Sequence, residues 1–203
     1  MKVAGVILAG GQSRRMGGGD KCLRALGGRP ILSWIIARAM PQVDRLALNA
    51  NGDPARFAAF GLPVIPDGIA GFPGPLAGVL AGLDWASGYT HLVTFAADAP
   101  FFPLDLVARF KAAIVDGRHD LACAASDGRA HPVFGIWEVR LREDLRRAMV
   151  EEGVRKVDQW TARHRLIEVE FSSSPTDPFF NANHPEDLVE AESMRRAHPE
   201  VEL

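Results

Sequence analysis

The stretch of this sequence that carries the most chemistry is residues 8–21, LAGGQSRRMGGGDK, directly after the apolar run VAGVI at 3–7. It holds five glycines, the adjacent Arg14 and Arg15, and Lys21. Glycine has no Cβ, so backbone N–H groups can come close to a ligand. A concave run of such amides attracts anions, and the cationic side chains donate further to phosphate oxygens. The segment predicts a triphosphate-binding loop at the carboxyl end of a first strand.

Two common phosphate-binding motifs do not fit this loop. A Walker loop needs Gly before its Lys and Ser or Thr after it, whereas Lys21 stands between Asp20 and Cys22. The dinucleotide fingerprint G-x-G-x-x-G fails because Gly10 and Gly11 are adjacent and Arg14 takes the place of the third glycine. An ordinary Gly-rich turn is the alternative, but a turn needs one or two glycines.

Polar residues also follow three later strand-like segments. The amide of Asn49 can pair with a base edge or a ribose hydroxyl. The carboxylate of Asp67 can accept from guanine N1 and N2 or from a ribose. Asp98 follows the apolar run HLVTFAA and suits Mg²⁺, which takes one or two carboxylates together with phosphate oxygens. A turn Asn and helix-capping or loop Asp residues would give the same pattern, so both interpretations stay open.

Two Gly- or Asn-containing segments and one histidine complete the candidates. In GFPGPLAG (71–78), Gly74 and Gly78 leave room for close backbone approach, although a plain helix-start loop would look the same. Asn181 and Asn183 alternate, so in an extended chain one is expected to line a site while the other caps the last helix. His131 precedes a proline at a strand start, where a histidine is more often structural, although a general base is the alternative interpretation.

Strand-like and helix-like segments alternate along the chain. Apolar or alternating runs predict strands at 3–8, 45–51, 62–67, 91–98, 120–126, 132–139 and, at a sheet edge, 165–171. Helical spacing predicts helices at 30–40, 54–60, 76–87, 103–115, 141–152, 155–163 and 185–197. This order is typical of an α/β fold, a three-layer α/β/α arrangement with a mostly parallel sheet, in a single domain over 1–203. Ligands of such folds bind at the carboxyl ends of strands.

The composition excludes several classes of protein. At 203 residues, 47% hydrophobic and 24% charged, the chain has the make-up of a globular protein. A net charge of −2 argues against a nucleic-acid surface. The 2 cysteines give no disulfide framework or zinc spacing, and no apolar run reaches the length of a membrane span, so we expect a cytoplasmic protein with structural thiols. The sequence shows no motif for a catalytic nucleophile, which suits a reaction that transfers a group directly from donor to acceptor.

The pattern L-A-G-G-x-S-x-R-M-G-G-x-D-K resembles the signature of the molybdenum cofactor guanylyltransferases. These enzymes belong to a larger nucleotidyltransferase group with a Rossmann-like, nucleotide-diphospho-sugar-transferase-like fold. Many members of that group carry L-A-A-G, so Gly10 favours the guanylyl branch. Four further segments resemble the family in the same order, namely PGPLAG (73–78), DAPF (98–101), RAHPVFGIW (129–137) and NANHPE (181–186).

The resemblance implies a role for each matching residue. The implied nucleotide-binding residues are Leu8, Ala9, Gly10, Gly11, Lys21, Asn49, Asp67 and Asp98. The implied acceptor-binding residues are Arg15, Gly18, Gly74, Gly78, Asn181 and Asn183, with Asn183 the stronger candidate of the last two. Arg15, Lys21 and Asp98 are the implied catalytic residues, and Asp98 is the implied ligand of Mg²⁺.

The implied reaction transfers GMP from GTP to the terminal phosphate of molybdopterin, with or without molybdenum, and releases pyrophosphate. A cytidylyltransferase or a sugar-phosphate nucleotidyltransferase is the alternative within the class. A non-catalytic nucleotide-binding carrier of the cofactor is the alternative outside it, and the intact Lys21 and Asp98 argue against it. Molybdoenzymes that receive the cofactor, or their chaperones, are expected partners; nucleic acids and membranes are not.

Overall fold

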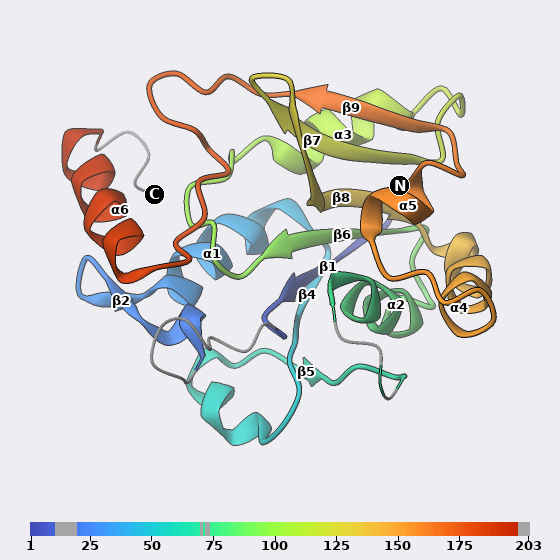
Figure 1. Ribbon diagram of the computed structural model, residues 1–203, viewed down its shortest axis with the longest axis horizontal. Helices are drawn as coiled ribbons and strands as arrows, with labels where there is room; N and C mark the ends of the chain where they lie inside the picture. Colours follow the sequence, from blue (N-terminus) through green and yellow to red (C-terminus); the bar gives the residue numbers. More distant parts are fainter. Residues whose placement is uncertain (11–19, 70, 72–73, 199–203) are drawn as a thin grey trace.

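A seven-stranded sheet forms the centre of the protein (Figure 1). The computed structural model describes residues 1–10, 20–69, 71 and 74–198. The order of the strands across the sheet is β5-β4-β1-β6-β8-β7-β9, and within the described residues β8 alone runs against its neighbours. The strands are β1 (Val3–Leu8), β4 (Arg45–Asn49), β5 (Val64–Ile65), β6 (His91–Ala96), β7 (Leu121–Ser126), β8 (Arg129–Glu138) and β9 (Leu166–Glu170). The predicted mostly parallel sheet is confirmed, with β9 at its edge.

Helices cover both faces of the sheet and complete the predicted three layers. The helices are α1 (Ile31–Ala39), α2 (Pro75–Trp85), α3 (Leu106–Ile114), α4 (Arg142–Val150), α5 (Val157–Thr161) and α6 (Pro185–Ala197). Buried residues of α1 and α3 share one core cluster, which also takes in Ala191 of α6. Buried residues of α2, α4 and α5 form the cluster on the other face. No helix in the described part of the chain is long and apolar enough to cross a bilayer.

The structure differs from the sequence-based expectation in several local elements. A short antiparallel hairpin, β2 (Ala25–Leu26) and β3 (Arg29–Pro30), was not predicted. Gly27 and Gly28 form its turn with φ values of 59° and 76°, which glycine adopts readily. The predicted strand at 62–67 shrinks to the two residues of β5, the predicted helix at 155–163 to the five residues of α5, and 54–60 folds as a 3-10 helix, η4 (Pro54–Phe60). The length and type of such short elements depend on packing against neighbouring segments more than on their own hydrophobic periodicity.

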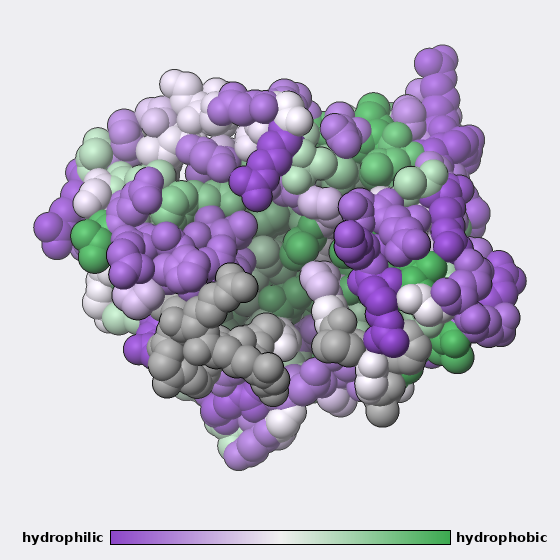
Figure 2. All heavy atoms as spheres, in the orientation of Figure 1, coloured by the Kyte–Doolittle hydropathy of each residue, from purple (hydrophilic) through white to green (hydrophobic). Residues whose placement is uncertain are grey.

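The order of the strands places a switch point between β1 and β6. The chain passes from β1 to β4 and β5 on one side, and then to β6 on the other side of β1. Leu8, the last residue of β1, pairs with Asn49 of β4 and with Ala96 of β6. In open α/β sheets, ligands bind outside the carboxyl ends of the strands at such a point. Figure 2 shows a hollow in the middle of the visible face, with hydrophobic residues inside it and hydrophilic residues to its left and right.

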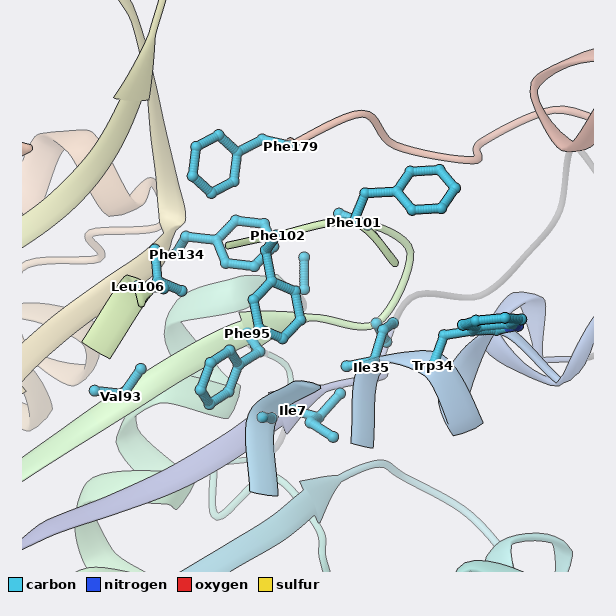
Figure 3. Close-up of a cluster of buried hydrophobic side chains, with 14 of the residues drawn as sticks. Ile7, Trp34, Ile35, Val93, Phe95, Phe101, Phe102, Leu106, Phe134 and Phe179 are labelled. Atoms are coloured by element: carbon cyan, nitrogen blue, oxygen red, sulfur yellow. The ribbon is translucent and has the colours of Figure 1, made fainter. Parts of the chain in front are cut away.

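Aromatic packing holds the segment after β6 in place (Figure 3). The ring centroid of Phe102 lies 5.1 Å from that of Phe95 and 5.6 Å from that of Phe134. Phe134 in turn lies 5.0 Å from Phe179, which comes from the segment before α6. The buried Arg38 of α1 donates through Nε to the Phe102 carbonyl at 2.7 Å, and burial lowers the pKa of this guanidinium to about 10. The segments after β6 and before α6 are therefore fixed against one core.

Candidate active site

Three segments that are distant in sequence meet at Lys21. This residue begins a short 3-10 helix, η2 (Lys21–Leu23). Its Nζ donates to Oδ2 of Asp98 at 2.6 Å and to Oδ1 of Asn183 at 2.5 Å. The side chains of Lys21 and Asp98 are 18% and 26% exposed, so the pair is open to a ligand but partly shielded from water. The backbone supports the same arrangement, because Ala182 N donates to the Asp98 carbonyl at 2.9 Å.

This cluster has the groups that a phosphorylated ligand needs. An ammonium group has three N–H donors, and Asp98 and Asn183 take two of those on Lys21 among the described residues. Asp98 accepts from Lys21 through Oδ2, and a carboxylate has further lone pairs on both oxygens. No group of three or more His, Cys, Asp or Glu side chains in the described part of the chain is placed to hold a metal ion. The cluster therefore fits a cation that takes one carboxylate together with phosphate oxygens and water, as Mg²⁺ does.

A second polar cluster surrounds Asp67, beyond the end of β5. Asn49 Nδ2 donates to Oδ1 of Asp67 at 2.9 Å and to the Ile65 carbonyl at 3.1 Å. Asn51 Nδ2 donates to Oδ2 of Asp67 at 2.7 Å, and Asp67 N donates back to the Asn51 side-chain oxygen at 2.9 Å. Two amides thus fix the orientation of one carboxylate. Asn49 is only 2% exposed, which favours a role in holding Asp67 over direct contact with a ligand.

Gly78 in α2 is part of the same cluster through packing. It is buried, and a methyl group in its place would overlap the side-chain oxygen of Asn49 and lie 2.9 Å from Cδ2 of Leu8. The Asn49 side chain therefore fills the space beside this glycine. The structure gives Gly78 a packing reason of its own, and its contact with an acceptor stays a prediction.

The loop before α2 approaches the segment before α5. Gly74 precedes the first residue of α2 with φ 130°, a conformation that residues with a Cβ rarely adopt. Arg155 Nη1 donates to the Gly71 carbonyl at 2.9 Å, so the two segments are joined. Arg155 was not among the residues that the sequence singled out. The sequence offers no signal for this contact, because it spans 84 positions.

The remaining predicted residues fall into three groups. Leu8, Ala9 and Gly10 lie at the carboxyl end of β1, where Ala9 N donates to the Asn49 carbonyl at 2.9 Å. Asn181 is half-buried near the cluster, and its carbonyl accepts from Asn183 N at 3.1 Å. Gly11, Arg15 and Gly18 lie outside the described residues. The roles of all of these residues stay predictions.

The residue that caps α6 differs from the sequence-based expectation. Asp187 caps α6, because its Oδ2 accepts from the backbone N of Asn183 at 2.6 Å and from that of His184 at 2.8 Å. The capping role expected of one asparagine therefore falls to this carboxylate.

His131 packs against residues of two other segments. Its Nε2 lies 2.7 Å from Oγ of Ser126, and its ring centroid lies 4.5 Å from that of Phe179. Burial lowers the pKa of His131 from its ordinary value. These contacts favour the structural interpretation of His131.

Comparison with known proteins identifies the family. Residues 5–166 match the model of the MobA-like NTP transferase domain. The chain is 56% identical over 196 residues to a molybdenum cofactor guanylyltransferase of a Bradyrhizobium species (strain ORS 278), with 95% of this chain and 92% of the relative covered. The chain belongs to the molybdenum cofactor guanylyltransferase family. A relative of the same name from Rhodopseudomonas palustris (strain BisB5) is 57% identical over 193 residues, covering 93% of this chain and 92% of the relative. The resemblance seen in the sequence is thereby confirmed, and with it the class of nucleotidyltransferases.

Solved structures confirm the fold of this guanylyltransferase family member. Molybdopterin-guanine dinucleotide biosynthesis protein A from Archaeoglobus fulgidus superposes with a TM-score of 0.74 at 23% identity, covering 97% of this chain and 100% of the other. A CMP:2-keto-3-deoxy-manno-octonic acid synthetase in complex with CTP superposes with a TM-score of 0.74 at 12% identity, covering 98% and 100%. A Mycobacterium tuberculosis protein in complex with manganese superposes with a TM-score of 0.70 at 17% identity, covering 95% and 99%.

Proposed function

We propose that this protein transfers GMP from GTP to the terminal phosphate of molybdopterin, forming molybdopterin guanine dinucleotide and pyrophosphate. The observation that carries the proposal is the contact of Lys21 with Asp98 at 2.6 Å, at the carboxyl ends of β1 and β6 in a member of this family. A cation and a carboxylate at the switch point of the sheet are the two charges that a nucleoside triphosphate with its divalent cation requires.

The proposed step is a direct displacement at phosphorus. An oxygen of the acceptor phosphate forms a bond to the α-phosphorus of GTP, and the bond from that phosphorus to the oxygen bridging to the β-phosphate breaks. Pyrophosphate leaves with the electron pair. The acceptor phosphate is already ionised near neutral pH, so the reaction needs alignment and charge neutralisation more than a strong general base. Lys21 would donate to the phosphate oxygens on which negative charge builds, and Asn183 would hold Lys21 in that place.

Asp98 is the residue that would hold Mg²⁺. When bound, Mg²⁺ neutralises charge on the nucleotide oxygens and so favours attack at the α-phosphorus. One carboxylate is enough for this cation, because phosphate oxygens and water complete its coordination. Lys21 shares the Asp98 carboxylate in the structure, so this pair fixes the orientation of the carboxylate before a nucleotide binds.

The base of the nucleotide would contact the Asp67 cluster. A carboxylate oriented by Asn49 and Asn51 keeps lone pairs that can accept from guanine N1–H and N2–H. Cytosine presents one exocyclic donor and a ring acceptor, so it matches two carboxylate oxygens less well. A cytidylyltransferase would need another donor pattern at this point. The oriented carboxylate therefore supports guanine over cytosine.

We expect Gly78→Ala to weaken GTP binding by roughly tenfold, because the added methyl group displaces Asn49 and breaks its hydrogen bond to Asp67. Isothermal titration calorimetry with GTP and Mg²⁺ measures this change. The matched control is Gly88→Ala, since a Cβ at Gly88 meets no atom within 4 Å. Equal affinities of the two variants would contradict the packing role of Gly78.

Pyrophosphate release tests the proposed function. The protein is incubated with Mg²⁺ and one of GTP, CTP, ATP or UTP, with and without molybdopterin. We expect release with GTP and molybdopterin together. Release with CTP instead would indicate a cytidylyltransferase, and release with a sugar phosphate as acceptor would indicate a sugar-phosphate nucleotidyltransferase. Binding of nucleotide with no release in any combination would favour a carrier of the cofactor. We also propose a cytoplasmic location and transfer of the product to molybdoenzymes or their chaperones.

A further inference from the structure

Arg56 joins its own segment between β4 and β5 to the residue that precedes Lys21. It lies in η4, between the strands β4 and β5. Its Nε donates to Oδ2 of Asp20 at 2.5 Å, its Nη1 donates to the Asp53 carbonyl at 2.5 Å, and its Nη2 donates to the Asn51 carbonyl. The guanidinium also lies over the ring of Phe57, 4.6 Å from its centroid. The Arg56 guanidinium donates to three acceptors and packs on one aromatic ring. It therefore has less conformational freedom than the guanidinium of a typical surface arginine.

The first end of this connection is Asp20, the residue directly before Lys21. Its carbonyl accepts from Leu23 N at 3.1 Å, so Asp20 starts the 3-10 turn η2 that carries Lys21. The side chains of Arg56 and Asp20 are 29% and 20% exposed, so their ion pair is partly shielded from solvent. Arg56 therefore holds the side chain of the residue whose backbone carbonyl starts η2, directly before Lys21.

The second end of the connection is the Asp67 cluster. Asn51 accepts from Arg56 through its backbone carbonyl and makes two hydrogen bonds to Asp67 through its side chain. The chain of contacts therefore runs from Asp67 through Asn51 and Arg56 to Asp20, and from there along the backbone to Lys21. Each link joins groups within hydrogen-bond distance. The carboxylate proposed to contact the base and the amine proposed to contact the phosphates are thus tied to one side chain.

We propose that Arg56 is a positioning residue, which fixes Lys21 through its ion pair with Asp20 and links Lys21 to the Asp67 carboxylate through Asn51. The proposal rests on the proposed function for the role of Lys21 on the polyphosphate. A displacement of about 1 Å in a group that aligns a reaction lowers its rate by about 100-fold. Fixing the base-contacting and phosphate-contacting groups to each other places the α-phosphorus at a constant distance from the bound base.

Turnover of Arg56 variants, alone and combined with Lys21→Ala, tests this coupling. We expect Arg56→Ala to lower kcat by about 10- to 100-fold, with a smaller change in KM for GTP. Arg56→Lys restores part of kcat, because it keeps the charge opposite Asp20 but loses the planar fork. In a Lys21→Ala background, Arg56→Ala lowers kcat no further, since its effect on kcat acts through Lys21. The control is Arg163→Ala, which removes an exposed ion pair of 2.6 Å with Glu152.

Two kinetic outcomes would overturn the proposal. One is an Arg56→Ala variant with the same kcat as Arg163→Ala. The other is a double variant whose fold-loss of kcat equals the product of the losses in Arg56→Ala and Lys21→Ala. Such independent effects would mean that Arg56 does not act through Lys21. Unfolding of the Arg56→Ala variant is recognised separately, because it lowers the melting temperature. It would also lower kcat in the Lys21→Ala background, whereas the proposed positioning effect would not.

Chemical labelling of Lys21 provides a readout that does not depend on the reaction. Amines are acetylated with acetic anhydride, and mass spectrometry follows Lys21 against Lys2, Lys111 and Lys156 as internal references. We expect Arg56→Ala to raise the relative rate of Lys21, and Arg163→Ala to leave it unchanged. An unchanged rate in Arg56→Ala overturns the positioning role. A raised rate in a protein whose wild type transfers no GMP would mean that the proposed function fails while the positioning role stands.

Discussion

Lys21→Ala is expected to lower the turnover of GTP and molybdopterin by two to three decades without unfolding the protein. The loss of one cationic contact to a developing charge costs roughly 3–4 kcal/mol of transition-state stabilisation. The fold should survive, because Lys21 is partly exposed and its partners Asp98 and Asn183 are held by their own backbone contacts. Steady-state pyrophosphate release gives the rate, and circular dichroism gives the melting temperature.

The matched control for this prediction is Lys111→Ala, which removes a lysine in the last turn of α3. Its turnover should equal that of the wild type. Lys21→Arg is a further comparison, because it keeps the charge but changes its shape, and we expect it to recover only part of the rate. Wild-type turnover in Lys21→Ala would contradict the assignment of Lys21 to the polyphosphate.

Asp98→Asn is expected to abolish the dependence of turnover on Mg²⁺ and to lower turnover about a thousandfold. A bound cation contributes several kcal/mol of charge stabilisation, and each decade of rate corresponds to about 1.4 kcal/mol. The substitution keeps the size of the side chain, and the Asn oxygen can still accept from Lys21. The measurement is turnover over a titration of Mg²⁺, with Mn²⁺ titrated in parallel.

The control for Asp98 is Asp116→Asn, which alters an exposed carboxylate 3.1 Å from Arg118 Nε. This variant should respond to Mg²⁺ as the wild type does. An Asp98→Asn variant with an unchanged Mg²⁺ titration would place the metal at another residue. Loss of turnover together with a large fall in melting temperature would instead indicate that Asp98 is needed for the fold.

The candidate site was partly predictable from the sequence. Asn49, Asp67 and Asp98 each stand after an apolar run, and the rule that ligands bind at strand ends was enough to select them. Asn51 stands in the same N-A-N stretch as Asn49, so attention to alternate positions would have found it. Gly27-Gly28 between two short runs is a recognised hairpin signal that would have predicted β2 and β3. Arg56 gives no such signal, because arginine in a short helix is common on any surface.

The sequence by itself determined the alternation of strands and helices and the family to which the chain belongs. These depend on side chains that are close along the chain, where spacing alone fixes geometry. The tertiary structure alone decided that Lys21 meets Asp98 and Asn183, which lie 77 and 162 positions away. It also decided that Asn49 fills the space beside Gly78 and that Arg56 joins Asp20 to Asn51. Such contacts follow from the order of strands in the sheet and from core packing, which depend on burial over the whole chain and not on any local pattern.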